Sequence, residues 1–164
     1  MKKRINSKAK GNKNELECTK ILDERFGKGL FLRVPSSGAI TGKSNKVRIA
    51  NISDAAKDTL SGDIITPANF AFSIEHKAYK EASFWDLFNK SSNLFEWFKQ
   101  STEDAEFVNK KPLLIIKYNR HERIAFVWNW DLKLLGLNHV FEINNWRCYY
   151  LSDLLKLEDS FWYM

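Results

Sequence analysis

The sequence predicts a single α/β domain in which a mixed β-sheet is flanked by helices. Apolar runs of strand length alternate with longer segments of helical period, in the order helix, three strands, helix and further strands. The 164 residues are 44% hydrophobic and 28% charged, as in folded proteins with one buried core. The sequence shows no internal repeat, no second domain boundary and no apolar run of membrane-spanning length.

The positive charge of the chain is concentrated at its N-terminus. The net charge of +6 equals the contribution of six basic residues that precede the first acidic residue, Glu15. The other 20 basic residues balance the 20 acidic ones. We therefore expect residues 1–11 to form a flexible basic arm ahead of a domain over 12–164. Such an arm suits a phosphate backbone, and a solubilising tail is the alternative.

The first helix is expected from Asn12 to Phe26, with Gly27 ending it. Its apolar side consists of Leu16, Cys18, Ile21, Leu22 and Phe26. Glu15 falls on the same stripe, where a carboxylate is costly unless it is paired or binds a cation. The alternative is a first-turn glutamate that the helix N-terminus stabilises.

Three strands are predicted after the first helix. Residues 30–34 form the first strand, and the turn-forming segment 35–38 follows it. Residues 39–61 lack an apolar pattern and are expected to form a mobile loop that orders on its ligand. Residues 63–66 and 71–77 form the next two strands.

A second long helix is predicted from Phe84, with Ser83 as its N-cap. Polar residues at 91–93 allow a kink in it. One broad stripe of this helix is aromatic, made of Phe84, Trp85, Phe88, Phe95, Trp97 and Phe98. So wide an apolar surface indicates a core face plus a contact with a second copy of the chain. A stacking platform for bases is the alternative reading.

The last third of the chain is predicted to add a β-hairpin and several short elements. The hairpin pairs residues 113–117 with 123–128. The shorter elements are a helix over 130–137, strands over 140–143 and 146–151, and a terminal helix over 152–157 capped by Ser152. Trp128, Trp130 and Trp146 in this part match no motif.

Two acids and a lysine form the candidate site. Asp63 begins one strand, and Glu75 and Lys77 share one face of the next, because side chains two residues apart point the same way. Paired carboxylates can hold Mg²⁺ and leave waters on the ion. The lysine could orient or deprotonate such a water. A solvated sheet face carrying these three residues is the alternative.

The histidines and cysteines are expected to be bystanders. His76 alternates away from the face of Glu75, so its side chain is expected to be packed or solvated, and His121 is expected to be exposed in a hairpin turn. Cys18 and Cys148 stand at no metal-site spacing and are interpreted as reduced core thiols. With the lack of a signal peptide, they indicate an intracellular protein.

Five short motifs follow one another in a distinctive order. They are Lys10-Gly11-x-x-x-Glu15, Arg33-Val34-Pro35-Ser36-Ser37-Gly38, Gly62-Asp63-Ile64, Glu75-His76-Lys77 and Gln100. This order, over about residues 8–117, resembles the PD-(D/E)xK nuclease superfamily and, within it, the archaeal-type and phage Holliday-junction resolvases. There are two departures. Gly62 replaces the family's usual proline, and the loop between Gly38 and Gly62 is longer than in compact archaeal members.

The resemblance implies a restriction-endonuclease-like fold and a role for each matching residue. Asp63, Glu75 and the main-chain carbonyl of His76 would bind Mg²⁺, with Mn²⁺ expected to substitute. Lys77 would position or activate the attacking water, and Gln100 would align Lys77 or the substrate. Glu15 completes the catalytic set by orienting a metal-bound water or helping to hold a metal. The residues expected to contact DNA are Lys8, Lys10, Lys13, Arg33, Ser36, Ser37, Lys43, Lys46 and Arg48.

From this resemblance we expect a Mg²⁺-dependent endonuclease that acts as a homodimer on four-way DNA junctions. Two symmetric nicks require two active sites, which fits the aromatic surplus as a dimer contact. A restriction-type or general duplex endonuclease of the same fold is one alternative. A catalytically inert DNA-binding protein is the other.

Overall fold

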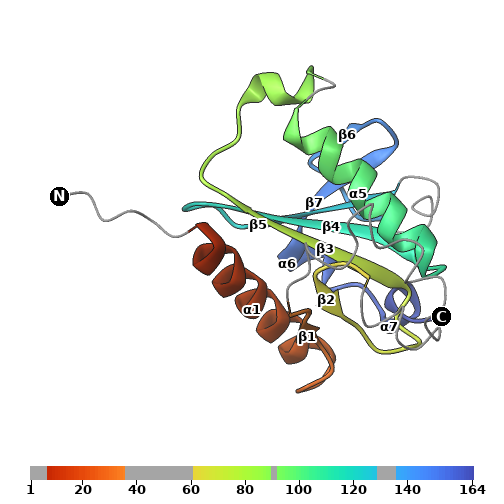
Figure 1. Ribbon diagram of the computed structural model, residues 1–164. Coiled ribbons are helices and arrows are strands. Elements are labelled where there is room, and N and C mark those ends of the chain that lie inside the picture. Colours follow the sequence, from red (N-terminus) through yellow and green to blue (C-terminus); the bar gives the residue numbers. More distant parts are fainter. Residues whose placement is uncertain (1–6, 36–60, 90–91, 129–135) are drawn as a thin grey trace.

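The computed structural model describes residues 7–35, 61–89, 92–128 and 136–164 (Figure 1). Several predictions lie outside these ranges: the first six residues of the arm, nearly all of the loop over 39–61, and most of the helix over 130–137. The same is true of Ser36, Ser37, Lys43, Lys46 and Arg48. No helix among the described residues is long and apolar enough to span a bilayer.

The described residues form a seven-stranded mixed sheet in the order β1-β2-β3-β4-β5-β7-β6. The strands are β1 Leu32–Arg33, β2 Ile64–Ile65, β3 Phe72–Tyr79, β4 Lys111–Tyr118, β5 Arg123–Trp128, β6 Phe141–Ile143 and β7 Trp146–Tyr150. Among these seven strands of the described residues, only β3 and β4 pair in parallel, and α5 lies in the connection between them, as parallel neighbours require. The predicted mixed sheet with flanking helices is confirmed, although β1 and β2 are shorter than the predicted strands over 30–34 and 63–66.

Two long helices cover opposite faces of this sheet: α1, Ser7–Phe26, and α5, Asn93–Phe107 (Figure 1). The faces follow from alternation along β4. Leu113 and Ile115 pack in the cluster that contains Cys18 and Leu22 of α1, whereas Leu114 and Ile116 pack with residues of α5. β3 extends well beyond its short neighbour β2, so side chains on the second half of β3 can be reached from both helices.

Helix α1 begins at Ser7, earlier than the predicted Asn12, so residues 7–11 are helical and do not belong to a flexible arm. Lys and Ala at positions 8–10 are good helix formers, and Asn14 Nδ2 donates a hydrogen bond to the Lys10 carbonyl at 2.8 Å. Leu16, predicted on the apolar side, is exposed. The stripe facing the core consists of Cys18, Leu22 and their partly buried neighbours.

The predicted helix from Phe84 is divided into two elements. Ser83 forms a capping box with Asp86, but the box caps only a 3₁₀ turn, Phe84–Leu87. The hydroxyl of Ser92 then donates to the Asp86 carbonyl at 2.8 Å and folds the chain back before α5 begins at Asn93. Polar residues compete with the backbone for such bonds, which explains the interruption.

The C-terminal segment packs on the α1 side of the sheet. Helix α6, Leu151–Leu154, begins directly after β7, so Tyr150 is its N-cap and the predicted cap Ser152 lies inside the helix. Helix α7, Asp159–Trp162, was not predicted and inserts the buried Trp162 among core aromatics. Arg25 fixes this segment to α1, since its Nε donates to the Leu155 carbonyl at 2.7 Å.

Candidate active site

The polypeptide enters the site through a turn that only glycine fits. Gly62 has φ +71°, and a Cβ there would lie 2.5 Å from the Ile74 carbonyl oxygen. Two main-chain hydrogen bonds hold Asp63 in place. The Asp63 N–H donates to the Ile74 carbonyl at 2.9 Å, and the Asp63 carbonyl accepts from the Val34 N–H at 3.0 Å. Proline is fixed near φ −65°, so it cannot adopt this conformation. The departure from the family's proline therefore has a local backbone cause.

The carboxylate of Asp63 is held against β3. Its Oδ2 accepts a hydrogen bond from the backbone N–H of His76 at 3.0 Å, which places it beside Glu75. Both carboxylates are buried, and the Glu75 side chain is only 1% exposed. Burial, and then the neighbouring Asp63, raise the pKa of Glu75 well above its usual value. The structure thus brings together the two acids that the sequence analysis predicted as metal ligands.

Lys77 lies on the same face as Glu75, as strand alternation predicted. Its Nζ donates to Glu75 Oε1 and to Gln100 Oε1, the latter at 3.2 Å. Burial alone would lower the pKa of Lys77, but the carboxylates of Glu75 and Asp63 outweigh it and raise that pKa. The ammonium and both predicted partners therefore form one cluster between β3 and α5.

Glu15 reaches this cluster from α1. Its side chain is mostly buried, and Arg33 Nη1 lies 3.4 Å from its Oε2. Burial and the nearby Asp63 raise the pKa of Glu15, while Arg33 and Lys77 oppose that rise. Because α1 begins at Ser7, Glu15 is not in the first turn, and the alternative of a glutamate stabilised by the helix N-terminus is wrong. Its partners are the other site residues.

Asp104 belongs to the same cluster and was missed as a site residue. It lies one helical turn after Gln100, whose side chain hydrogen-bonds to it. Burial and the Asp63 carboxylate raise the pKa of Asp104 to about 6. Its backbone carbonyl accepts from Ser61 Oγ at 2.6 Å, so α5 is tied to the turn that carries Asp63. The i, i+4 spacing from Gln100 was the available signal.

The donor set suits a hard divalent cation. Glu75 Oε2 is buried and has no hydrogen-bond partner among the described residues, an unsatisfied acidic oxygen that is costly in a metal-free protein. Within those same residues, no three His, Cys, Asp or Glu side chains are grouped closely enough to hold a metal by themselves. Two carboxylates completed by main-chain oxygen and water match the preference of Mg²⁺, which keeps several waters.

The predicted DNA contacts are only partly described. Lys8, Lys10 and Lys13 are carried by α1 near Glu15, and Lys13 forms a long, exposed pair with Glu17 at 4.0 Å. Arg33 is not free, because it pairs with Glu15 and donates to the Val34 carbonyl. The positive charge of Arg33 is thus partly neutralised by Glu15 within the site.

The side chains of the two histidines and two cysteines expected to have no role lie where the sequence analysis placed them. His76 is buried on the opposite face, and burial, with Arg123 nearby, lowers its pKa to about 4. His121 is exposed in the hairpin turn. Burial raises the pKa values of Cys18 and Cys148 to about 12, so neither thiol is poised as a nucleophile.

Comparison with known proteins identifies the class. A family model described as "Phage putative PDDEXK endonuclease" matches residues 6–136. This match defines the class of the chain, which is a nuclease of the PD-(D/E)xK type with DNA as its substrate. The chain belongs to this phage endonuclease family. It is 34% identical over 122 residues to Protein D14 of Escherichia phage T5, covering 71% of this chain and 67% of that protein. No solved structure matches the chain of this protein.

Proposed function

We propose that the protein is a Mg²⁺-dependent, structure-selective DNA endonuclease that resolves four-way junctions by phosphodiester hydrolysis. The observation that carries this proposal is the buried cluster of Asp63, Glu75 and Lys77, in which one oxygen of Glu75 has no partner among the described residues. A solvated sheet face, the alternative considered for these residues, would not bury both acids. Two buried carboxylates beside an ammonium support metal-dependent hydrolysis of a phosphodiester.

In this proposal Asp63, Glu75 and the main-chain carbonyl of His76 hold the cation, and Glu15 orients a water or helps to hold a metal. When bound, the ion lowers the pKa of a water and polarises the phosphate. Burial of the two adjacent carboxylates favours a cation there, because Lys77 supplies one positive charge for two negative ones. Glu15 reaches the site from a different helix, so its contribution can be tested separately from that of the strand residues.

Lys77 supplies the positive charge for the reacting phosphate. Its ammonium is already aimed by two acceptors, Glu75 Oε1 and Gln100 Oε1. Gln100 is in turn fixed by Asp104, so the amide oxygen, not the amide nitrogen, faces the lysine. A preoriented ammonium stabilises negative charge that develops on the phosphate in the transition state.

DNA would be guided to the site by basic residues on two segments. Lys8, Lys10 and Lys13 lie on α1, and Arg33 follows at the end of β1. The other proposed contacts are Ser36, Ser37, Lys43, Lys46 and Arg48. The net charge of +6 supports binding to a phosphate backbone.

The junction preference and a homodimer are proposed together, since paired nicks need two active sites. The aromatic residues Trp85 and Phe88 support the dimer, because they are 72% and 68% exposed on the 3₁₀ turn and directly after it. Side chains of this size are enriched in the centres of protein interfaces.

Digestion of matched substrates tests this function. A four-way junction and a linear duplex of the same sequence are incubated with Mg²⁺ and the wild-type protein, with Asp63→Asn as the inactive control. We expect the junction to be cut at least about tenfold faster. Equal rates would identify a general duplex endonuclease. Absence of cleavage with either Mg²⁺ or Mn²⁺ would identify an inert DNA-binding protein.

A further inference from the structure

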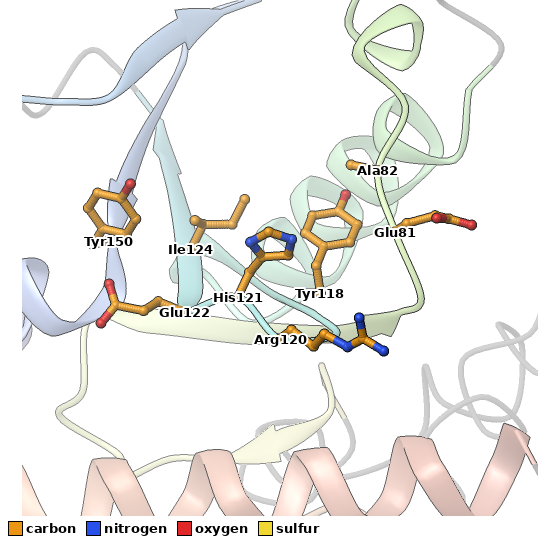
Figure 2. A pocket seen from close by; sticks show the side chains of 8 residues that line it. All are labelled: Glu81, Ala82, Tyr118, Arg120, His121, Glu122, Ile124 and Tyr150. Carbon is orange, nitrogen blue, oxygen red and sulfur yellow. The ribbon is translucent and has the colours of Figure 1, made fainter.

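A pocket of about 560 Å³ lies at the end of the sheet, beside the β4–β5 hairpin (Figure 2). Two tyrosines form its sides, Tyr118 at the end of β4 and Tyr150 at the end of β7, and Ile124 of β5 lies between them in Figure 2. Glu81 and Ala82, which follow β3 directly, line it as well. None of these residues has a role in the catalytic cluster.

The pocket lies on the same face of the sheet as Lys77. Lys77 pairs with Ile116, Ile116 with Ile124, and Ile124 with Tyr150, so these four residues form one row across β3, β4, β5 and β7. Side chains of directly paired residues share a face. With strands about 4.8 Å apart, the Cα atoms of Lys77 and Tyr150 are separated by roughly 14 Å. A DNA strand rises about 3.4 Å per nucleotide, so the pocket is within about four nucleotides of the catalytic lysine.

The lining favours a flat, uncharged group over a phosphate. Tyr118 and Tyr150 offer ring faces, and Ile124 offers an aliphatic surface between them. Around them are two carboxylates, Glu81 and Glu122, with other polar groups. The Glu122 carboxylate repels an anion and accepts hydrogen bonds from amino groups, whereas the Glu81 carboxylate is also paired with Lys80 at 3.3 Å.

We propose that this pocket binds an unpaired nucleobase of the DNA substrate, stacked on Tyr150, with a preference for bases that carry an exocyclic amino group. The proposal rests on the proposed nuclease function and specifies what that enzyme recognises beside the scissile phosphate. Stacking on aromatic side chains is the general means of holding single-stranded bases. Arg120, at the rim of the pocket, can pair with the phosphate adjoining that base. Tyr150 lies beyond the 6–136 family match, so the pocket combines family and non-family residues.

Binding can be measured without cleavage. A single-stranded oligonucleotide that contains 2-aminopurine is titrated with protein in EDTA, and its fluorescence reports stacking. We expect Tyr150→Ser to weaken binding by roughly 5- to 100-fold. Phe107→Ser is the matched control, because Phe107 is also an aromatic residue of similar exposure, 46% against 44%, at the C-terminal end of α5. It should bind as the wild type does.

A second variant guards against a local folding defect at Tyr150. Ala82→Leu adds bulk to the pocket from the segment after β3 without altering a strand, and it should also weaken binding. If Tyr150→Ser and Ala82→Leu both bind the oligonucleotide as tightly as Phe107→Ser, the proposal is overturned. Because no hydrolysis is needed, a protein that binds the base but never cuts DNA contradicts the proposed function alone.

Discussion

Gln100 on α5 accepts a hydrogen bond from Lys77 Nζ on β3 at 3.2 Å, and its side chain also bonds to Asp104. The lysine is thus held between a strand carboxylate and a helix amide. Because the amide is fixed from its other end, the direction of the ammonium depends on α5 as well as on β3. The position of α5 therefore helps to determine where the Lys77 ammonium points.

Replacing Lys77 by alanine should reduce DNA cleavage by about 10³-fold or more while leaving DNA binding intact, because the ammonium stabilises charge in the transition state. Asp63→Ala and Glu75→Ala should have the same effect. Single-turnover cleavage with Mg²⁺ gives the rate, and a gel-shift assay in EDTA gives the binding. Lys156→Ala serves as the control, since its ammonium pairs with Asp153 on the far C-terminal segment. Cleavage at the parental rate by the site variants would show that the site is wrongly assigned.

Mg²⁺ should stabilise the protein against heat. An ion that binds only the folded state at about 100 times its Kd adds about 2.7 kcal/mol, which raises the Tm of a chain of this size by roughly 5–10 °C. The measurement is a thermal melt with and without millimolar Mg²⁺ or Mn²⁺. Asp63→Asn should lose the shift. A wild-type Tm that neither ion changes would favour the inert DNA-binding alternative.

The metal-free protein should lose stability as the pH rises through the titration of Asp104. Its pKa is raised from 3.8 to about 6, mainly by burial and by Asp63, so the folded chain holds this proton more tightly than the unfolded chain. The resulting stabilisation is complete below pH 3.8 and disappears as the pH passes about 6. Asp104→Asn should therefore become more stable than wild type by about 1–2 kcal/mol at about pH 7, a value reduced because the carboxyl is only partly buried.

Denaturant unfolding in EDTA at several pH values between about 4 and 7 measures that difference. Glu106→Gln, a change to an exposed acidic residue on α5 that does not contribute to the raised pKa of Asp104, is the control and should follow the wild-type pH profile. A difference between Asp104→Asn and wild type that stays constant over this range would contradict the raised pKa of Asp104.

Disruption of the exposed aromatic pair should separate the proposed dimer. Trp85 and Phe88 have ring centroids 6.1 Å apart, so they present one apolar surface at the 3₁₀ turn. The double variant Trp85→Ser, Phe88→Ser should sediment as a monomer where the wild type sediments as a dimer. Wild-type protein that is monomeric at micromolar concentration would contradict the dimer.

The sequence predicts which candidate side chains lie together better than it predicts the boundaries of the helices. Glu75 and Lys77 share a face because strand alternation is a local property, and the carboxylate of Asp63 follows from pairing of adjacent strands. The early start of α1, the interruption between Leu87 and Asn93, and the cap at Tyr150 depend on which competing hydrogen bonds the tertiary structure permits. Periodicity does not encode that choice.

Asp104 was missed for a related physical reason. The negative charge of Asp63 acts on its side chain, and Ser61 ties its main-chain carbonyl to the turn before β2. The spacing of Asp104 from Gln100 indicates a shared face of α5, but no spacing rule joins Asp104 to Ser61 or Asp63. The same limit applies to the pair between Arg33 and Glu15, which joins two elements that no spacing rule connects.

Gly62→Ala should destabilise the protein and displace Asp63 at the same time. At φ +71° any side chain is strained, and here the added Cβ would also lie 2.5 Å from the Ile74 carbonyl oxygen, a backbone atom that cannot rotate away. Gly29 separates the two effects, because it has φ +81° but a Cβ added there would meet no atom within 4 Å. We expect Gly29→Ala to lower the free energy of unfolding by about 1 kcal/mol and Gly62→Ala by about 3 kcal/mol or more.

Denaturant unfolding measures both losses of stability, and equal losses would show that the contact with the Ile74 carbonyl relaxes freely. Cleavage should fall only in Gly62→Ala, since the Asp63 backbone bonds to Ile74 and Val34 shift with the turn.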